Sequence, residues 1–170
     1  MTSFWRCYGL ETVCLRYFNV FGPRQDPYSP YSGVLGKFIT QMLAGERVVI
    51  FGDGKHSRDF TYVENVVNAN LLACKAPAKD VAGKVFNIAS GRRIHLNEMY
   101  CLLQKLTGHS APAEHGPARQ GDVKHALADL SGAEQYLGYR PTVSFEEGLQ
   151  RTVEWYRAAA MRRREPVVSC

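Results

Sequence analysis

Two segments of this 170-residue chain have the composition of buried strands, and this small number constrains the fold. Val13–Val20 and Lys84–Ser90 are rich in β-branched and aromatic residues, and the first lacks a clean apolar–polar alternation, which is typical of strands covered on both faces. Segments with helical periodicity alternate with the strands, which predicts an α/β fold with at least partly parallel strands. Two strands make a poor sheet by themselves. We therefore expect the C-terminal part of a larger fold, or one half of an assembly.

The other elements follow from apolar spacing and from residues that end helices. Helices are predicted at Val34–Leu43, Tyr62–Lys75, Asn97–Leu106, Ser131–Leu137 and Phe145–Ala159. A short strand is predicted within Arg47–Gly52. The segment 111–123 is expected to be extended because it is rich in proline.

Composition narrows the classes of function. Hydrophobic residues make up 45% of the chain, and no apolar run approaches the roughly 20 residues of a membrane span. The five cysteines form no C-x-x-C pair and the N-terminus has no signal-peptide core, so a cytoplasmic chain with reduced thiols is expected. The histidines show no metal-binding spacing. The net charge of +5 includes one dense cluster, Arg162–Arg164, which is typical of a solvated basic tail at 161–170 rather than a nucleic-acid-binding arm.

A polar amide, Asn19, stands where the first buried strand gives way to a loop. Ligands of open α/β sheets gather at the carboxyl ends of the strands. An amide at such an end can donate to a phosphate and accept from a cofactor amide. Asn also commonly caps its own turn, so the residue alone leaves both roles open.

Arg58 follows a tight turn that contains two glycines, and it precedes an aromatic pair and a predicted helix. A guanidinium group in this position can clamp a phosphate with two donors. A structural pair with Asp59 or Glu64 is the alternative. Asp59 lies near the helix start, which predicts a capping role for its carboxylate.

Arg119 and Asp122 are three residues apart in the segment that is expected to be extended. A cation with a nearby carboxylate suits a nucleotide, because the cation can bind phosphate and the carboxylate can bind ribose hydroxyls. A surface salt bridge is the alternative.

Four segments, in this order, strongly resemble the C-terminal half of the NAD-dependent nucleotide-sugar epimerases and dehydratases, which are extended short-chain dehydrogenase/reductases: LRYFNVFGPRQDPYSPYSGVLGKF, VVIFGDGKHSRDFTYVENVVNANLLA, VFNIASGRRIHLNEM and RQGDVKHALADLSGAEQYLGYRPTVSFEEGLQRTVEWY. The resemblance runs from about Tyr8 to Tyr156 and is nearest to UDP-glucose and UDP-N-acetylglucosamine 4-epimerases. It implies that residues 1–160 form a substrate-binding, C-terminal half of a Rossmann-like fold, and that the N-terminal dinucleotide-binding half is absent.

The resemblance also implies ligands and residue roles. The residues implied to lie beside NAD are Tyr17, Phe18 and Asn19. The residues implied to bind a UDP-sugar are Asn19, Gly33, Val34, Val49, Ile50, Phe51, Arg58, Arg119 and Asp122. Among these, the amide and the two arginines would bind the diphosphate, residues 49–51 would line the uracil, and Asp122 would bind the ribose. Gly33 and Val34 would begin the helix under the nucleotide.

The chain departs from the family where catalysis takes place. It contains no G-x-G-x-x-G or G-x-x-G-x-x-G loop, and no Tyr is followed four residues later by Lys. At that spacing Tyr8 is followed by Thr12, Tyr62 by Val66 and Tyr100 by Gln104. No catalytic residue or metal ligand is therefore assigned, and the chain alone is predicted to be inactive and to hold NAD poorly.

Several identities stay open at this point. The chain could be the substrate domain of a UDP-hexose 4-epimerase, or a non-catalytic UDP-sugar-binding or interaction module from a truncated gene. A dTDP-glucose dehydratase or a UDP-glucuronate decarboxylase is the nearer alternative among enzymes. Because apolar faces and strand edges are expected to be exposed, we expect a homo-oligomer or a partner chain that carries the missing half.

Overall fold

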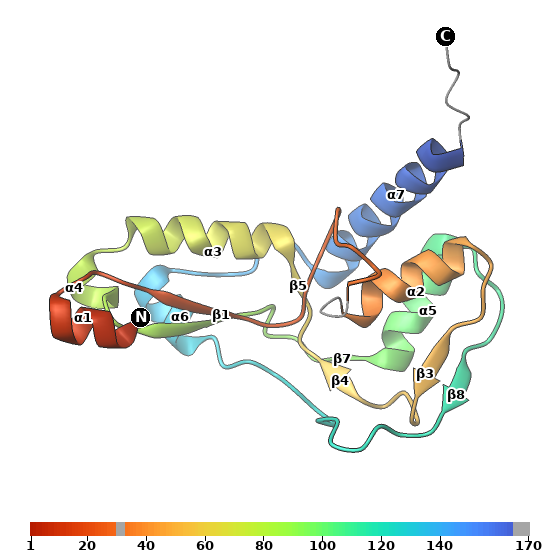
Figure 1. Ribbon diagram of the computed structural model, residues 1–170, viewed down its shortest axis with the longest axis horizontal. Coiled ribbons are helices and arrows are strands. Elements are labelled where there is room, and N and C mark those ends of the chain that lie inside the picture. The colour runs from red at the N-terminus through yellow and green to blue at the C-terminus, as the bar shows by residue number, and fades with distance from the viewer. Residues whose placement is uncertain (30–32, 165–170) are drawn as a thin grey trace, which may run out of the picture. The chain divides into compact units, whose positions relative to one another are not determined.

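The computed structural model describes residues 1–29 and 33–164, and the chain divides into two units (Figure 1). The first unit consists of Met1–Val20, Ser57–Ile94 and Lys124–Phe145. The second unit consists of Phe21–His56, His95–Val123 and Glu146–Cys170. The segments alternate along the chain, so neither unit is a continuous stretch of sequence.

The first unit is built on two parallel strands. β1 (Cys14–Tyr17) pairs with β6 (Val85–Ile88) in a register that runs from Cys14 opposite Val85 to Tyr17 opposite Ile88. The helices of this unit are α1 (Thr2–Tyr8), α3 (Val63–Lys75), α4 (Ala78–Val81) and α6 (Ser131–Leu137). The buried core of this unit consists of Val66, Ala69, Val81, Phe86, Ile88, Ala133, Leu137 and Tyr139, and α1 contributes no buried residue.

The second unit also contains a parallel pair, β3 (Val49–Phe51) with β8 (Glu114–Gly116). Its helices are α2 (Val34–Leu43), α5 (Leu96–Thr107) and α7, which spans Phe145–Arg164 and begins at the last residue of the first unit. α2 packs against α5, and the rings of Phe38 and Tyr100 meet edge to face at 6.4 Å. The core of this unit includes Leu35, Ile39, Met42, Val48, Ile50, Met99, Leu103, Leu149 and Val153.

Two further strand pairs are short. β2 (Val20–Phe21) pairs with β5 (Thr61–Tyr62), and β4 (Ser57–Arg58) pairs with β7 (Ile94–His95). Within residues 1–29 and 33–164, no helix combines the length and the hydropathy that a membrane span requires.

The predicted helices are confirmed, and their ends differ by a few residues. α2 and α6 have the predicted bounds, and α5 stops before Gly108, whose φ of 80° lies in the left-handed region that favours glycine. α7 continues past the predicted end, Ala159, to Arg164. β8, which lies inside the proline-rich segment, was not predicted.

One prediction about the strands is wrong. Val13–Val20 is not one strand buried on both faces, because it breaks at Phe18 and Asn19, and the residues of β1 are half-buried or exposed. Among the described residues, β1 pairs with a neighbour along one edge only. Leu15 of β1 and Val13, which directly precedes the strand, pack against the core of the first unit.

The first unit also leaves large apolar side chains at its surface. Tyr17, Val67, Leu71 and Val85 have 46%, 53%, 54% and 55% of their surface exposed, respectively. A groove of about 370 Å³ lies beside β1, lined among others by Leu15, Tyr17, Asn70, Ala73 and Cys74. Exposed apolar groups of this kind favour association with another surface.

We predict that the full chain is not a stable monomer at roughly 50 µM, a concentration at which exposed apolar surface and strand edges drive association. Light scattering after size exclusion should give a mass above 19.1 kDa. The paired change Val67→Lys and Leu71→Lys should lower that mass, whereas Tyr28→Lys, which alters an exposed residue of the second unit, should not. A monodisperse monomer would contradict this prediction.

Tyr139 connects the core of the first unit to the end of β6. The residue is fully buried, and its hydroxyl donates to the carbonyl of Ala89 at 2.8 Å. Burial, and secondly the negative charge of Asp59, raise the pKa of Tyr139 to about 12. The folded state therefore binds this proton more tightly than the unfolded state, in which the pKa is near 10.

A Tyr139 pKa that is higher in the folded than in the unfolded state contributes stability that is complete below pH 10 and is lost as the pH rises to about 12. Urea unfolding of the wild type should therefore lose free energy across this window. Tyr139→Phe should flatten the slope, although Tyr100 and Tyr156 still contribute because burial raises their pKa values too. The hydroxyl itself should be worth about 1 kcal/mol at pH 7. Equal slopes for both proteins would refute the assignment.

Candidate functional site

Asn19 lies two residues beyond the end of β1 with a φ of 36°, in the left-handed region that Asn tolerates better than most residues. Its Nδ2 donates to the carbonyl of Asp59 at 2.9 Å. The amide thus reaches across to a segment 40 residues away instead of capping its own turn. The residue is exposed, and its Oδ1 forms no hydrogen bond with the described residues.

The loop that carries Asn19 is held on the segment from Asp59 to Thr61. The backbone N–H of Thr61 donates to the carbonyl of Asn19 at 3.2 Å. The Thr61 hydroxyl donates to the carbonyl of Phe18 at 2.6 Å. With the side-chain bond of Asn19, three hydrogen bonds join these two segments of the first unit.

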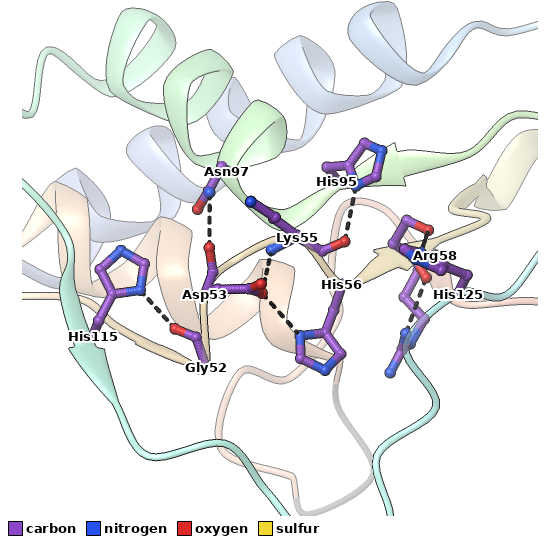
Figure 2. A network of polar contacts seen from close by, with 10 residues as sticks. Gly52, Asp53, Lys55, His56, Arg58, His95, Asn97, His115 and His125 are labelled. Atoms are coloured by element: carbon purple, nitrogen blue, oxygen red, sulfur yellow. Dashed lines mark hydrogen bonds and ion pairs between the residues drawn. The ribbon is translucent and has the colours of Figure 1, made fainter.

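Arg58 is half-buried in β4, directly before Asp59 (Figure 2). Its Nη1 donates to the carbonyl of Ser57 at 2.9 Å. The hydroxyl of Ser57 in turn lies 2.8 Å from Nδ1 of His125. Arg58 and Asn19 therefore lie on segments that Asp59 and Thr61 join within one unit.

The predicted capping role of Asp59 is wrong. α3 begins at Val63 with Tyr62 as its N-cap residue, and no side chain caps it. Asp59 is fully buried, and its carboxylate accepts hydrogen bonds from residues 90, 91 and 128. Nearness in sequence to a helix start suggested a cap, but the donors that this carboxylate binds belong to distant loops.

In the second unit, β3 presents two of its three residues to solvent. Val49 and Phe51 are exposed, whereas Ile50, between them, is 1% exposed and packs into the core. Successive side chains of a strand point to opposite faces, which explains the alternation. The side chain of Ile50 therefore faces the core, and the assignment of Val49, Ile50 and Phe51 to a base stays a prediction.

Arg119 stacks on one of those exposed residues. Its guanidinium carbon lies 4.0 Å from the centre of the Phe51 ring, a cation–π contact. A Cβ atom added to Gly116 would lie 3.2 Å from the same ring, so the glycine lets β8 approach Phe51 closely. The backbone N–H of Asp122 donates to the carbonyl of Arg119 at 3.4 Å, and both residues are exposed.

Gly33 is the N-cap residue of α2 and is exposed, and Val34 is the first helical residue, as predicted. The preceding part of the PYSGV segment, Pro30–Ser32, lies outside the described residues. The two units together hold every residue predicted to bind a ligand: 17–19 and Arg58 in the first unit, and the others in the second unit. Convergence of Asn19, Arg58 and Arg119 on one diphosphate stays a prediction.

The exposed side chains of Tyr17 and Asn19 are two of the groups of the first unit that were predicted to contact NAD. The exposed ring of Tyr17, whose hydroxyl donates to Asn70 at 3.1 Å, and the exposed amide of Asn19 fit a flat ring that carries a carboxamide. The turn after β6 offers two successive backbone N–H groups, from Ser90 and Gly91, but Asp59 already binds both. Tyr17 and Asn19 thus fit the nicotinamide end of NAD, whereas the N–H groups of the Ser90–Gly91 turn are already occupied by Asp59.

The turn Gly52–His56 is fixed by side chains that the sequence did not single out as a set (Figure 2). His115 Nδ1 lies 2.7 Å from the carbonyl of Gly52, and His95 Nδ1 lies 2.9 Å from that of Lys55. Because a carbonyl only accepts, each Nδ1 carries the proton. Asn97 donates from its side chain to the carbonyl of Asp53 at 3.1 Å. Among the described residues, no group of three or more His, Cys, Asp or Glu is arranged to hold a metal ion.

The comparison with protein families settles the family of the chain. The sequence model described as NAD dependent epimerase/dehydratase family matches residues 1–89, more than half of the chain. The chain belongs to this family.

Individual relatives agree with this assignment. A putative UDP-glucose 4-epimerase of Methanocaldococcus jannaschii is 37% identical and matches 89% of this chain but 48% of its own length. The crystal structure of UDP-glucose 4-epimerase with UDP-glucose from Thermotoga maritima is 46% identical, with a TM-score of 0.87, and the match covers 93% of this chain and 50% of that chain. UDP-glucuronic acid 4-epimerase from Bacillus cereus, in complex with UDP-glucuronic acid and NAD, is 32% identical with a TM-score of 0.82 over 92% and 48%. This chain thus spans about half the length of the relatives it matches.

Gly54 in the fixed turn offers a test of how tightly the second unit is packed. It is buried with a φ of +69°, and an added Cβ would lie 1.8 Å from Oδ1 of Asn97. Gly45 has a similar φ of +74° but open space around its Cβ position. Alanine variants of Gly45 and Gly54 therefore separate the cost of backbone strain from the cost of a steric clash.

We predict that Gly45→Ala lowers the free energy of unfolding by about 1 kcal/mol through backbone strain alone. Gly54→Ala should cost roughly 2–4 kcal/mol, because strain is combined with displacement of Asn97 and loss of its bonds to the turn. Urea denaturation monitored by circular dichroism measures both values. Equal losses would show that Asn97 does not fix the turn.

Proposed function

We propose that this chain is the substrate-binding portion of an NAD-dependent nucleotide-sugar epimerase of the UDP-hexose 4-epimerase type. The observation that carries this proposal is the likeness to UDP-glucose 4-epimerase from Thermotoga maritima, with 46% identity and a TM-score of 0.87 over 93% of this chain. That structure contains UDP-glucose. The same donors that the sequence suggested for a diphosphate are present on exposed or half-buried segments of this chain.

The donor set suits a diphosphate. Asn19 and Arg58 lie on joined segments of the first unit, and Arg119 is exposed in the second. Guanidinium groups bind phosphate oxygens with two parallel, charge-assisted hydrogen bonds, and an amide adds a neutral donor. The net charge of +5 favours the approach of an anionic ligand.

Phe51 and Val49 provide an exposed apolar surface for the base in this proposal. The guanidinium of Arg119 lies on the Phe51 ring, so a cation for phosphate and a flat aromatic surface are adjacent. Aromatic rings bind flat heterocycles by offset stacking or edge contacts. Asp122, three residues further on, would accept hydrogen bonds from ribose hydroxyls.

In this proposal, the residues of this chain position the ligands, and the catalytic groups lie outside this sequence. Bound NAD would supply hydride-transfer chemistry at the sugar. In this proposal Tyr17 and Asn19 orient the nicotinamide end, and the arginines fix the diphosphate of the substrate. The glycine-rich loop and the Tyr-Lys pair would be supplied by residues outside this sequence, on the same polypeptide or on a partner chain. The chain alone is then inactive.

We predict that UDP-glucose binds the full chain and that Arg58→Ala or Arg119→Ala weakens binding by roughly 10- to 100-fold, the equivalent of one charge-assisted hydrogen bond. Calorimetric titration measures the affinities. Arg151→Ala, which removes a surface ion pair with Glu147 on α7, should leave the affinity unchanged.

Three outcomes of this titration would count against the proposal. Affinities of the Arg58→Ala and Arg119→Ala variants equal to that of the wild type would refute the roles assigned to these arginines. Tighter binding of dTDP-glucose or UDP-glucuronate than of UDP-glucose would favour the dehydratase or decarboxylase type. Turnover of UDP-glucose by the chain alone would refute its predicted inactivity.

A further inference from the structure

Asp59 is a buried carboxylate that no ligand role explains. It is 0% exposed, and its two oxygens accept hydrogen bonds from two loops of the first unit. Oδ1 accepts from the backbone N–H and the hydroxyl of Ser90, at 2.9 and 2.6 Å. Oδ2 accepts from the backbone N–H of Gly91 at 3.1 Å and that of Ala128 at 3.3 Å.

The backbone N–H groups of the Ser90–Gly91 turn bind an anion that belongs to the same chain, the carboxylate of Asp59. Gly91 has a φ of +71°, so the two successive N–H groups face the same acceptor. Such pairs of backbone donors bind phosphates and carboxylates in many proteins. Here the anion is part of the chain, so the turn is held in place before any ligand arrives.

The backbone of Asp59 extends this connection to Asn19. The carbonyl of Asp59 accepts from Asn19 Nδ2 at 2.9 Å. The carboxylate therefore holds the loop after β6, while the carbonyl of the same residue holds the loop after β1. Because β1 and β6 run parallel, both loops lie at the carboxyl ends of their strands. Arg58 is the residue next in sequence.

We propose that Asp59 is a positioning residue for the nucleotide-sugar site. Its carboxylate fixes the segment 58–61 on the Ser90–Gly91 turn and Ala128, and this segment sets the orientation of the Asn19 amide and the Arg58 guanidinium before the ligand binds. The ligand part of this inference rests on the proposed function. The coupling between the carboxylate and the Asn19 amide does not.

Asn65, a second buried polar side chain of the first unit, provides the matched control. Asn65 is 1% exposed, and its side chain binds the backbone of Thr142 and Val143 through both its oxygen and its nitrogen. It lies on α3 of the same unit and has no hydrogen bond with Asn19, Arg58 or Asp59 among the described residues. If a variant weakened UDP-glucose binding only by destabilising the fold, Asn65→Asp and Asp59→Asn should therefore weaken it to the same extent.

The test compares Asp59→Asn, Asn65→Asp and the wild type as full-length chains. Asp59→Asn keeps the size of the side chain but turns an amide NH₂ toward backbone donors. Two readouts are measured: the affinity for UDP-glucose by calorimetry, and the hydrogen exchange and chemical shifts of the Asn19 side-chain NH₂ by ¹⁵N NMR. We expect Asp59→Asn to weaken UDP-glucose binding at least tenfold and to speed exchange of the Asn19 amide. Asn65→Asp should change both by less than twofold.

Each outcome decides one part of the inference. If Asp59→Asn leaves the Asn19 signals and the affinity as in the wild type, the positioning role is refuted. If the wild type binds no UDP-glucose but Asp59→Asn still shifts the Asn19 signals, the coupling stands and the proposed function fails. If both buried variants weaken binding equally, Asp59 is merely structural. Should Asp59→Asn not fold, Ser90→Ala, which removes one of the four donors, should give a smaller loss in the same direction, and no change would refute the role.

Discussion

The parallel pairing of β1 with β6 is the interaction on which the candidate site depends. Parallel strands bring their carboxyl ends to the same edge of a sheet, and the loop with Asn19 and the turn with Ser90 and Gly91 therefore lie at that edge. The segment with Arg58 and Asp59 then joins both loops through hydrogen bonds of a backbone carbonyl and of a buried carboxylate. A slip of the register would separate these donors and acceptors, so strand pairing and site geometry are specified together.

Helices and the fold class could be predicted from the sequence because their signals are local. Apolar spacing and the glycine that ends α5 lie within each helix, and α2 and α6 have the predicted bounds. The burial of β1 could not be predicted in this way, since burial depends on which elements cover a strand. β8 was missed because three residues between prolines carry too weak a pattern.

Among the candidate site residues, too, local sequence signals were informative, whereas roles that depend on distant parts of the chain were not. Asn19 stood out as a polar amide at the end of a strand, and Arg58 stood out as a cation between a glycine turn and a predicted helix. The role of Asp59 was predicted incorrectly, because its partners Ser90 and Ala128 are 31 and 69 residues away in the chain. Ile50 was assigned to the base through the family resemblance, and its side chain is buried because successive residues of a strand face opposite sides. Its contact with a base stays a prediction.

The interleaved order of the two units has a consequence for biosynthesis. The core of the first unit needs residues as distant as Val66 and Tyr139, and Asn65 finds its partners 77 and 78 residues further on. Neither unit can reach its final packing while the last third of the chain is still on the ribosome. Folding of each unit must therefore await the synthesis of these distant segments, and such non-local topologies fold slowly. During that interval the nascent chain displays unpaired strands, which makes it prone to aggregation.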